Sequence, residues 1–537
     1  MILRVSAAMA CLILALATEV RADDRPNILL VMADDLGWSD LGAYGGEIDT
    51  PNLDALAKGG FLFTDFHASV SCSPTRSMLM SGNDNHIAGL GTMSELLAPN
   101  QEGQPGYEGH LNDRVASMAE VLRDAGYSTY MAGKWHLGHS EGTMPSDRGF
   151  EQTLTLLVGG ASHWSDRLGV LPRDDPADYA RNGQKLEELP ADFYSSRSYA
   201  DALMDMIRSG LSDDQPFFAY LAFTAPHDPV HAPEPWLSKY AGRYGEGYEV
   251  LKQQRWKAAK KLGLVPAGAP LPPRVPIVKP WDELTDEEKD REARSMEVYA
   301  GMLDAMDYHY GRVIDFLDDI GQLENTVVIF LSDNGANPWY SREYPEATKP
   351  EFTEQFDNSL ENVGRPGSNV AYGPGWATGS GGPLDRFKMT VGEGGIRVPL
   401  ILSGPGIPKG ESTGSFAYVW DILPTVMEIT GATYPEDKEQ PRGRSLMPLL
   451  DSSAEEIYGP EDLIGGEMGG GKWMRKGAFK AVAVPEPYGD GQWRLFNVEE
   501  DPGEVNDLSA EMPDLLKQLK AAWTEYSEDV GVIPAEN

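Results

Sequence analysis

Asp34, Asp35, Asp333 and Asn334 have the side chains that hard metal ions prefer, and each lies at the end of an apolar run. The two aspartates at 34 and 35 follow ILLVMA directly, whereas Asp333 and Asn334 follow VVIFL after one serine. Clustered carboxylates repel one another unless cations lie among them. Oxygen ligands favour Ca²⁺ or Mg²⁺, and Ca²⁺ tolerates irregular geometry better. The sequence therefore predicts a divalent metal site, with Ca²⁺ favoured over Mg²⁺.

Two further apolar runs end in residues that can move protons or hold anions. STYMA is followed by a glycine, Lys134, a tryptophan and His136, and FFAYLAF is followed by Thr-Ala-Pro and His227. An imidazole titrates near neutral pH, and a lysine ammonium is a compact positive charge. Taken singly, such residues are common in turns, helix caps and surface loops. Their occurrence after four separate runs predicts one shared site.

Cys72 stands where the sequence predicts the start of a helix. The run CSPTR occupies residues 72–76, Pro74 suits a first helical turn, and no helix breaker occurs before Gly82. A helix N-terminus favours negative charge, and Arg76 lies one turn further on, which suggests an activated thiolate nucleophile. A thiolate beside a hard cation is poorly matched, however, and an exported thiol is prone to oxidation.

Apolar runs alternate with helical patterns along most of the chain, which indicates an α/β fold. Runs that are apolar throughout are typical of strands buried on both faces of a parallel sheet. In open α/β sheets, ligands bind beyond the carboxyl ends of the strands, so the polar residues above should meet at one edge. The predicted strands are 28–33, 128–132, 217–223, 327–331 and 399–402, with helices over 118–125 and 299–317.

The remaining segments predict site walls and a second unit. Segments 230–283 and 336–385 are rich in proline and aromatic residues and are predicted to be irregular loops that wall the site. Beyond about residue 450, strand-like segments precede an amphipathic helix over 512–526, which predicts a small antiparallel sheet with a helix. The loop aromatics would contact an apolar leaving group or pack at the surface; they are Trp339, Tyr340, Tyr372 and Trp376.

The first 22 residues resemble a secretory signal peptide. Arg4 precedes a mostly apolar run, and VRA at its end fits a small-x-small cleavage site. A membrane anchor and a lipoprotein anchor at Cys11 are the alternatives, although the run is short for a membrane span. After cleavage Cys72 would be the single cysteine, so no internal disulfide is expected. We expect export to the periplasm or beyond, with no membrane segment after signal removal.

The 537-residue chain carries a net charge of −38 at pH 7. Nucleic acid is excluded as a partner because a protein must bring cations to phosphates. An anionic substrate would need a local cationic site that overcomes the general field.

The motifs together resemble the type I sulfatases, formylglycine-dependent members of the alkaline-phosphatase-like superfamily. Residues 72–76 match the family signature Cys-x-Pro-x-Arg, and 126–136 (GYSTYMAGKWH) match a second signature. Further blocks are Asp34-Asp35, Ala-Pro-His at 225–227, Asp-Asn-Gly at 333–335, and Lys388 ahead of EGGIRVP at 393–399. Six blocks occur in the family's order between residues 27 and 399, and the chain is similar in length to bacterial arylsulfatases.

This resemblance implies hydrolysis of sulfate esters, aryl sulfates above all, to an alcohol or phenol and inorganic sulfate. A formylglycine-generating maturation enzyme would convert Cys72 to Cα-formylglycine, whose hydrate is the nucleophile and forms a covalent sulfate intermediate. The resemblance also implies a catalytic sulfatase domain over 23–450 and a C-terminal subdomain over 451–537 with a four-stranded sheet. A phosphatase or phosphonate monoester hydrolase of the same superfamily is the alternative. A non-catalytic Ca²⁺-binding protein is a second alternative, if Cys72 stays a thiol.

The resemblance also implies a role for each residue of the site. Arg76, Lys134 and Lys388, with the metal ion, would reverse the acidic field where a sulfate monoanion docks. The implied metal ligands are Asp34, Asp35, Asp333, Asn334 and the modified Cys72. By the same resemblance, Arg76 and Lys134 would hold the modified residue, and Lys388 would bind sulfate oxygens, alone or with Lys134. Of the two histidines, His227 would protonate the leaving oxygen, and His136 would take the proton of the second hydroxyl.

Overall fold

The computed structural model describes residues 25–211 and 215–536. The predicted signal peptide, residues 1–22, and the alternative anchor at Cys11 lie outside the described residues. Within 25–211 and 215–536, no helix is long and apolar enough to cross a membrane.

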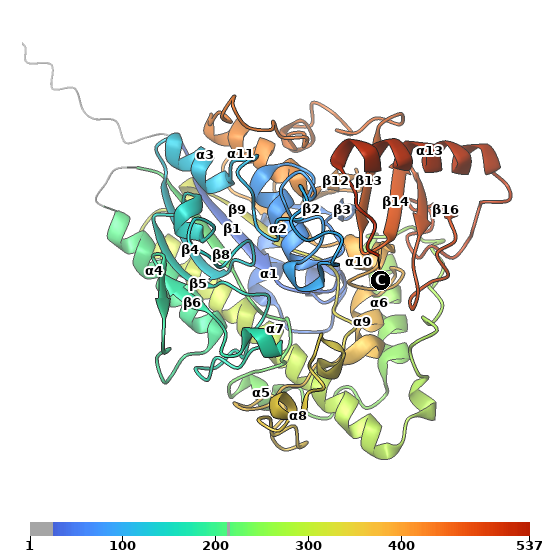
Figure 1. The fold of residues 1–537 in the computed structure, drawn as a ribbon, viewed down its shortest axis with the longest axis horizontal. Helices are drawn as coiled ribbons and strands as arrows, with labels where there is room; N and C mark the ends of the chain where they lie inside the picture. The colour runs from blue at the N-terminus through green and yellow to red at the C-terminus, as the bar shows by residue number, and fades with distance from the viewer. Residues whose placement is uncertain (1–24, 212–214, 537) are drawn as a thin grey trace, which may run out of the picture.

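A ten-stranded mixed sheet forms the centre of the molecule (Figure 1). The strand order is β11-β2-β10-β9-β1-β8-β4-β5-β6-β7, and the five strands from β9 to β5 are parallel to one another. β10 and β6 join this parallel block in antiparallel orientation. The predicted α/β fold with a large, mostly parallel sheet is confirmed. The strands are β1 (Asn27–Ala33), β2 (Phe61–Phe63), β4 (Ser128–Lys134), β5 (Gln152–Leu156), β6 (Tyr179–Arg181), β7 (Gln184–Leu186), β8 (Phe217–Ala222), β9 (Thr326–Ser332), β10 (Leu400–Ser403) and β11 (Glu411–Thr413).

Side chains of β1 alternate between two hydrophobic cores, because successive residues of a strand point to opposite faces. Leu29 and Val31 share a core with α1, α4 and α7, whereas Leu30 and Met32 share the other core with α2, α3 and α11. All four are fully buried, and each such burial contributes roughly 1.5–3 kcal/mol. Helices on both faces therefore explain the continuous apolar run. The helices are α1 (Pro51–Gly59), α2 (Cys72–Ser81), α3 (Met118–Asp124), α4 (Ser195–Gly210), α7 (Asp286–Asp319) and α11 (Ile422–Thr430).

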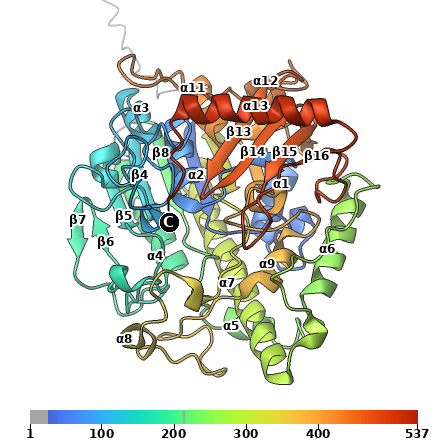
Figure 2. The same ribbon diagram turned by 45° about the vertical axis from the view of Figure 1, so that its right-hand side comes forward.

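The C-terminal part forms a second sheet of four antiparallel strands, along which α13 lies (Figure 2). Met474, Ala481 and Leu495 of the sheet meet Leu519 and Ala522 of α13 in a small separate core. The predicted smaller α+β unit is thus confirmed. Its elements are β13 (Leu463–Met468), β14 (Gly471–Lys476), β15 (Phe479–Ala483), β16 (Arg494–Asn497) and α13 (Pro513–Val530).

The prediction that 230–283 and 336–385 are irregular is wrong in part, because both segments contain helices. The first holds α6 (Tyr248–Leu262) and the second holds α9 (Gly373–Gly381). Strong helix formers fill α6, which ends at Gly263 in a left-handed conformation with φ +73°. The glycine-rich sequence of α9 does not favour a helix by itself. Its packing against α6 supplies the stabilisation instead.

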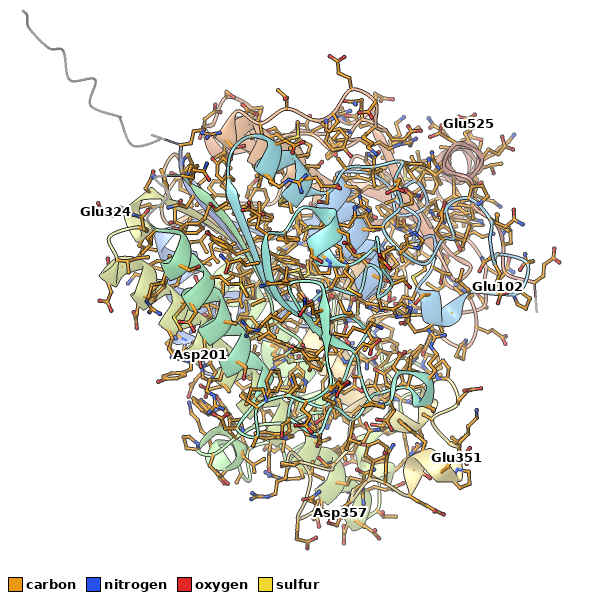
Figure 3. The ribbon with its side chains drawn as sticks, turned by 60° about the vertical axis from the view of Figure 1, so that its left-hand side comes forward. Glu102, Asp201, Glu324, Glu351, Asp357 and Glu525 are labelled. Carbon is orange, nitrogen blue, oxygen red and sulfur yellow. The ribbon has the colours of Figure 1, made fainter. Side chains whose placement is uncertain are left out.

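Acidic side chains dominate the surface, whereas the basic residues of the predicted site are buried. Glu324, Glu351 and Asp357 are exposed examples (Figure 3). Arg76 and Lys134 are at most 1% exposed. The exposed acidic residues and the buried basic residues of the site therefore lie in different parts of the molecule.

His86 links the loop after α2 to the C-terminal unit through buried ion pairs. Its Nδ1 lies 2.9 Å from Asp84 Oδ1, and its Nε2 lies 3.3 Å from Glu467 Oε2 in β13. The Tyr526 hydroxyl of α13 donates to Asp84 at 2.7 Å. Burial alone would lower the pKa of His86, but Asp84 and Glu467 outweigh it and raise the pKa to about 9. A charged His86 therefore ties the two units together near neutral pH.

Replacing His86 by glutamine is expected to destabilise the protein more at pH 6 than at pH 9.5. A group whose pKa rises on folding contributes stability that is present below its unfolded pKa and lost as the pH rises through its folded pKa, here about 9. The shift corresponds to about 3 kcal/mol. Urea unfolding of wild type and His86→Gln at both pH values measures the difference, with the exposed His139→Gln as control. An equal loss of stability at both pH values would contradict a charged His86.

Candidate active site

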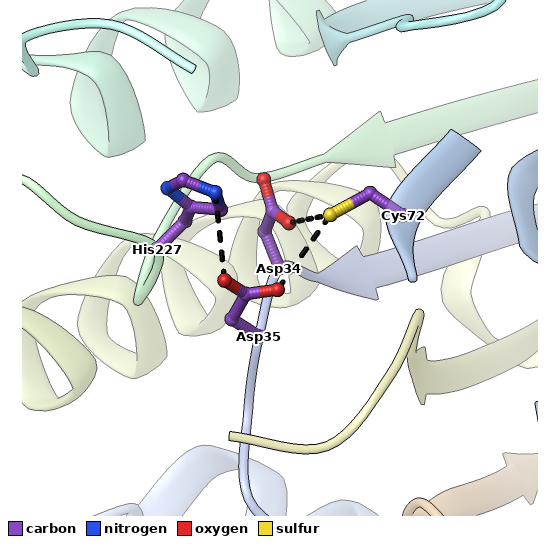
Figure 4. A group of neighbouring side chains, drawn as sticks. All are labelled: Asp34, Asp35, Cys72 and His227. Atoms are coloured by element: carbon purple, nitrogen blue, oxygen red, sulfur yellow. Dashed lines mark hydrogen bonds and ion pairs between the residues drawn. The ribbon is translucent and has the colours of Figure 1, made fainter. Parts of the chain in front are cut away.

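Polar residues that follow β1, β4 and β8 converge at the carboxyl edge of the sheet. Asp34 and Asp35 follow β1, and His227 lies in the loop after β8. Cys72 begins α2, and its sulfur points toward the two aspartates (Figure 4). One potential ligand atom from each of these four residues lies within 4.8 Å of the others. The predicted convergence of distant segments is therefore present, and Lys134 completes it at the last position of β4.

Each carboxylate of the site is paired with a buried basic side chain. Three cations thus balance three carboxylates, so these six side chains carry no net charge. Basic side chains therefore separate the carboxylates, and the prediction of a divalent ion rests on the oxygen donors of the site. The pairs are Lys134 Nζ to Asp34 Oδ2 (2.7 Å), Lys388 Nζ to Asp35 Oδ1 (2.7 Å) and Arg76 Nη2 to Asp333 Oδ2 (2.8 Å).

Basic partners keep Asp34 and Asp35 ionised although the site is buried. Burial alone would raise the pKa of Asp34, but Lys134 and then His227 outweigh it and lower the pKa. Burial would likewise raise the pKa of Asp35, and Lys388 and His227 lower it. Burial opposes the charge of Lys388, yet Asp35 raises its pKa well above the ordinary value.

Cys72 lies at the N-terminus of α2, as predicted, and is 1% exposed. Its Sγ is 3.4 Å from Asp34 Oδ1, 3.6 Å from Asp35 Oδ1 and 3.2 Å from Lys388 Nζ. Burial and then Asp333 raise the pKa of the Cys72 thiol well above its ordinary value. The protein groups around it therefore disfavour a thiolate nucleophile.

The amide of Asn334 leaves one polar atom without a partner. Its Nδ2 donates to Asp35 Oδ1 at 2.6 Å and to the Gly335 carbonyl at 2.9 Å. Its Oδ1 is buried and has no hydrogen-bond donor among the described residues. A buried acceptor without a partner costs about 1–3 kcal/mol, and a hard cation would satisfy it. The oxygen-rich donor set therefore fits Ca²⁺ or Mg²⁺.

The backbone supports this arrangement at Asp35, which adopts φ +63°. Aspartate tolerates this left-handed conformation better than most residues. The Asp35 amide donates to Asp333 Oδ1 at 3.1 Å, so the segments that follow β1 and β9 are joined directly at the site.

One ring nitrogen of His227 is hydrogen-bonded to the backbone, and the other faces a carboxylate. Its Nδ1 lies 2.6 Å from the Asp228 carbonyl oxygen, an acceptor, so Nδ1 carries a proton. Its Nε2 lies 3.4 Å from Asp35 Oδ2. Tyr344 lies beside the ring at 6.5 Å between centroids, and its hydroxyl donates to Asp228 Oδ1 at 2.9 Å. Sequence reasoning missed Tyr344, because a tyrosine in a long loop carries no signal of its position.

His136 lies outside the four-residue cluster and has a different partner. Its Nε2 is 3.0 Å from Glu95 Oε1, and both side chains are nearly buried. His136 itself has φ +58°, a conformation that is uncommon for a histidine. Sequence reasoning missed Glu95, which lies 41 positions before its partner.

The loop aromatics take several positions. Trp376 is fully buried and packs edge-on against Tyr248 and Trp281, so it lies in a core and not at an open wall. Trp339 packs against Tyr344 at 5.2 Å between centroids, and Tyr344 in turn lies beside His227.

A second group of potential metal ligands is already occupied by basic side chains. Asp65, His67 and Glu393 offer ligand atoms within 4.8 Å of one another. Lys480 lies 2.8 Å from Glu393, and Arg475 lies 2.8 Å from Asp65. Since both basic residues come from the C-terminal sheet, this cluster fastens that sheet to the large one.

A profile of the sulfatase family matches residues 26–432. The chain therefore belongs to the sulfatase family, and it is an enzyme that hydrolyses sulfate esters. It is 43% identical to an arylsulfatase of Klebsiella aerogenes over 429 residues, covering 79% of this chain and 91% of that one. It is also 43% identical to an uncharacterized sulfatase of Schizosaccharomyces pombe over 531 residues, covering 95% of each chain.

Solved structures share the fold. Ps i-CgsB in complex with k-i-k-neocarrahexaose has a TM-score of 0.68 at 23% identity, covering 96% of this chain and 95% of that one. The phosphonate monoester hydrolase of Agrobacterium radiobacter has a TM-score of 0.55 at 19% identity, covering 94% of this chain and 95% of that one. Because both structures are less than 25% identical to this chain, the comparison with them shows a shared fold and nothing more.

Proposed function

We propose that this sulfatase is an exported, Ca²⁺-dependent arylsulfatase whose nucleophile is a Cα-formylglycine made from Cys72. The position of Cys72 carries the proposal, since its buried sulfur lies within 3.6 Å of Asp34, Asp35 and Lys388. A buried, protonated thiol is a poor nucleophile, whereas an oxygen nucleophile suits a site of carboxylates and a hard cation. The 43% identity to an arylsulfatase supports aryl esters as the substrate class.

Asp34, Asp35, Asp333 and Asn334 would hold the ion, and the modified residue 72 would complete the ligand set. When bound, Ca²⁺ polarises the sulfate group and helps to ionise the attacking hydroxyl of the hydrated aldehyde. The unpartnered Asn334 Oδ1 supports an oxygen-liganded ion at this place. The irregular arrangement of ligands from two strand ends and a helix favours Ca²⁺ over Mg²⁺.

The charges of the chain prepare this site for a monoanion. Three carboxylates and three basic side chains sum to zero, so a divalent ion leaves an excess of +2. A sulfate monoester contributes −1 and the ionised hydroxyl another −1, which restores neutrality. Arg76 and Lys134 stabilise the charge on residue 72, and Lys388 contacts sulfate oxygens, alone or with Lys134.

Two histidines transfer the protons. His227 protonates the leaving oxygen through Nε2, because its Nδ1 is directed to the Asp228 carbonyl. His136 takes the proton of the second hydroxyl, so that sulfate is released and the aldehyde returns. Each transfer contributes about 10²- to 10⁴-fold to the rate.

A phosphatase or phosphonate monoester hydrolase is the second candidate, since a phosphonate monoester hydrolase shares the fold. Charge balance favours the sulfate, because a phosphate monoester dianion would leave one negative charge uncompensated. We expect kcat/KM for the sulfate ester of a phenol to exceed that for its phosphate ester by about 10²-fold, since one unbalanced buried charge costs a few kcal/mol. Rates on both esters of the same phenol provide the measurement. Preference for the phosphate ester would reject the sulfatase assignment of this site.

The chain would comprise an export signal, a catalytic domain and a C-terminal subdomain. The family match ends at residue 432 and β13 begins at Leu463, which supports a catalytic domain over 23–450 and a C-terminal subdomain over 451–537. Residues 1–22 would direct export to the periplasm or beyond. A formylglycine-generating enzyme would be the maturation partner, and a small-molecule sulfate ester the substrate.

A further inference from the structure

Glu95 and His136 form a buried pair beside the site. Glu95 lies in a short 3₁₀ turn (Ser94–Leu96), and its Oε1 is 3.0 Å from His136 Nε2. A carboxylate only accepts hydrogen bonds, so His136 presents an N–H at Nε2. The other ring nitrogen, Nδ1, is buried and has no partner among the residues that the structure describes. In the neutral ring this nitrogen is an acceptor, free to receive a proton.

Backbone packing leaves the two catalytic rings little freedom. A Cβ at Gly159 would lie 2.9 Å from Cε1 and 3.0 Å from Nε2 of His136, so only glycine allows the chain to lie against that ring. A Cβ at Gly160 would lie 3.1 Å from Cε1 of His227. The dipeptide after β5 therefore supports one histidine with each residue. Glu95 and Gly159 both contact the His136 ring at its Nε2 edge and so restrict its orientation.

We propose that Glu95 is a positioning residue, which holds His136 in the Nε2–H tautomer and so makes Nδ1 the atom that takes the proton during sulfate release. This inference rests on the proposed function of His136. In that step the O–H proton of the remaining hydroxyl on residue 72 moves to Nδ1. The electron pair of the O–H bond forms the C=O bond, and the carbon–oxygen bond to sulfate breaks with its electrons on the departing sulfate dianion.

The charges around the pair agree with this assignment. Burial alone would raise the pKa of Glu95, but His136 outweighs it and lowers the pKa to about 2, so Glu95 is a carboxylate. Burial lowers the pKa of His136, and Lys134 and Arg76 lower it further against the opposing effect of Glu95. His136 is therefore neutral near pH 7 and available as a base.

The pair also has a route to solvent. A cavity of about 250 Å³ is lined in part by Glu95, His136, Arg173 and Asp174. Arg173 Nη2 lies 3.8 Å from Glu95 Oε1, at the exposed side of the pair. The cavity therefore borders the pair on the side of Glu95 and the partly exposed Arg173.

The kinetic test compares Glu95→Gln and Glu95→Ala with Glu141→Gln, a matched change at an exposed glutamate. Glutamine can still accept from Nε2–H but lacks the charge, whereas alanine removes the acceptor. We expect kcat on an aryl sulfate to fall about 10-fold in Glu95→Gln and about 10²-fold in Glu95→Ala. KM should fall in the same proportion and kcat/KM stay unchanged, because kcat/KM reports only the steps through release of the phenol. The control should equal wild type.

A fall of kcat/KM in parallel with kcat, or an unchanged kcat in Glu95→Ala, would overturn the proposal. Failure of the proposed function itself looks different. In that case the wild type would carry no aldehyde at residue 72, or would lose no kcat on replacement of His136 by glutamine.

The second readout needs no turnover and uses the Cys72→Ala background. Histidine ¹⁵N labelling distinguishes the two ring tautomers, and the His136 signal is assigned by its loss in His136→Gln. We expect the Nε2–H tautomer both with the native Glu95 and in Glu95→Gln, and a mixture of tautomers in Glu95→Ala. A His136 signal of the Nδ1–H tautomer with the native Glu95, or no change in Glu95→Ala, would contradict the positioning role.

Discussion

Replacing Cys72 by alanine is expected to lower kcat/KM for an aryl sulfate on the order of 10⁶-fold, as loss of a catalytic nucleophile does. The reason is that alanine cannot be oxidised to an aldehyde, so no hydroxyl can attack sulfur. The side chain is buried and small, and its Sγ lies 3.2–3.6 Å from three charged groups. We therefore expect the variant to fold, which its thermal unfolding midpoint would check.

The matched control is the unchanged sequence produced without maturation. Mass spectrometry of the peptide that spans Cys72 distinguishes thiol from aldehyde. Activity of different preparations should rise in proportion to the aldehyde fraction and vanish in its absence. Full activity from protein with an intact thiol, or from Cys72→Ala, would remove residue 72 from the role of nucleophile.

Removal of the divalent ion should lower kcat on the order of 10³-fold, because Lewis-acid stabilisation is worth several kcal/mol and about 1.36 kcal/mol corresponds to a factor of ten. Without the ion the site carries no excess positive charge for the substrate and the ionised hydroxyl. Chelation followed by addition of Ca²⁺ or Mg²⁺ measures the effect, and Ca²⁺ should restore more activity. The unfolding midpoint should also rise with free Ca²⁺, since binding to the native state stabilises it.

Asn334→Ala tests where the ion binds. It should raise the Ca²⁺ concentration needed for half-maximal activity, while Asn325→Ala, an exposed amide outside the site, should not. Retention of full activity after chelation, with no effect of Ca²⁺ on the unfolding midpoint, would contradict a metal-dependent mechanism.

Local sequence patterns were enough to predict the central sheet of the fold. Strands such as ILLVMA are apolar throughout because helices cover both faces of the sheet. Such a run can be recognised in the sequence alone. The start of α2 at Cys72 was equally local, since Pro74 and Gly82 mark its two ends. By contrast, α9 could not be predicted, because its glycine-rich sequence is helical only through its packing against α6.

The types of the site residues came from the sequence, but their partners came from the tertiary structure. Lys388 and Asp35 are separated by 353 positions, and no local pattern records that they form an ion pair. Each of the three carboxylates has such a buried basic partner, and none of these pairs is local in the sequence. The roles of Glu95 and Gly159 could not be predicted for the same reason. Both residues contact His136 only because the folded chain brings them close to it.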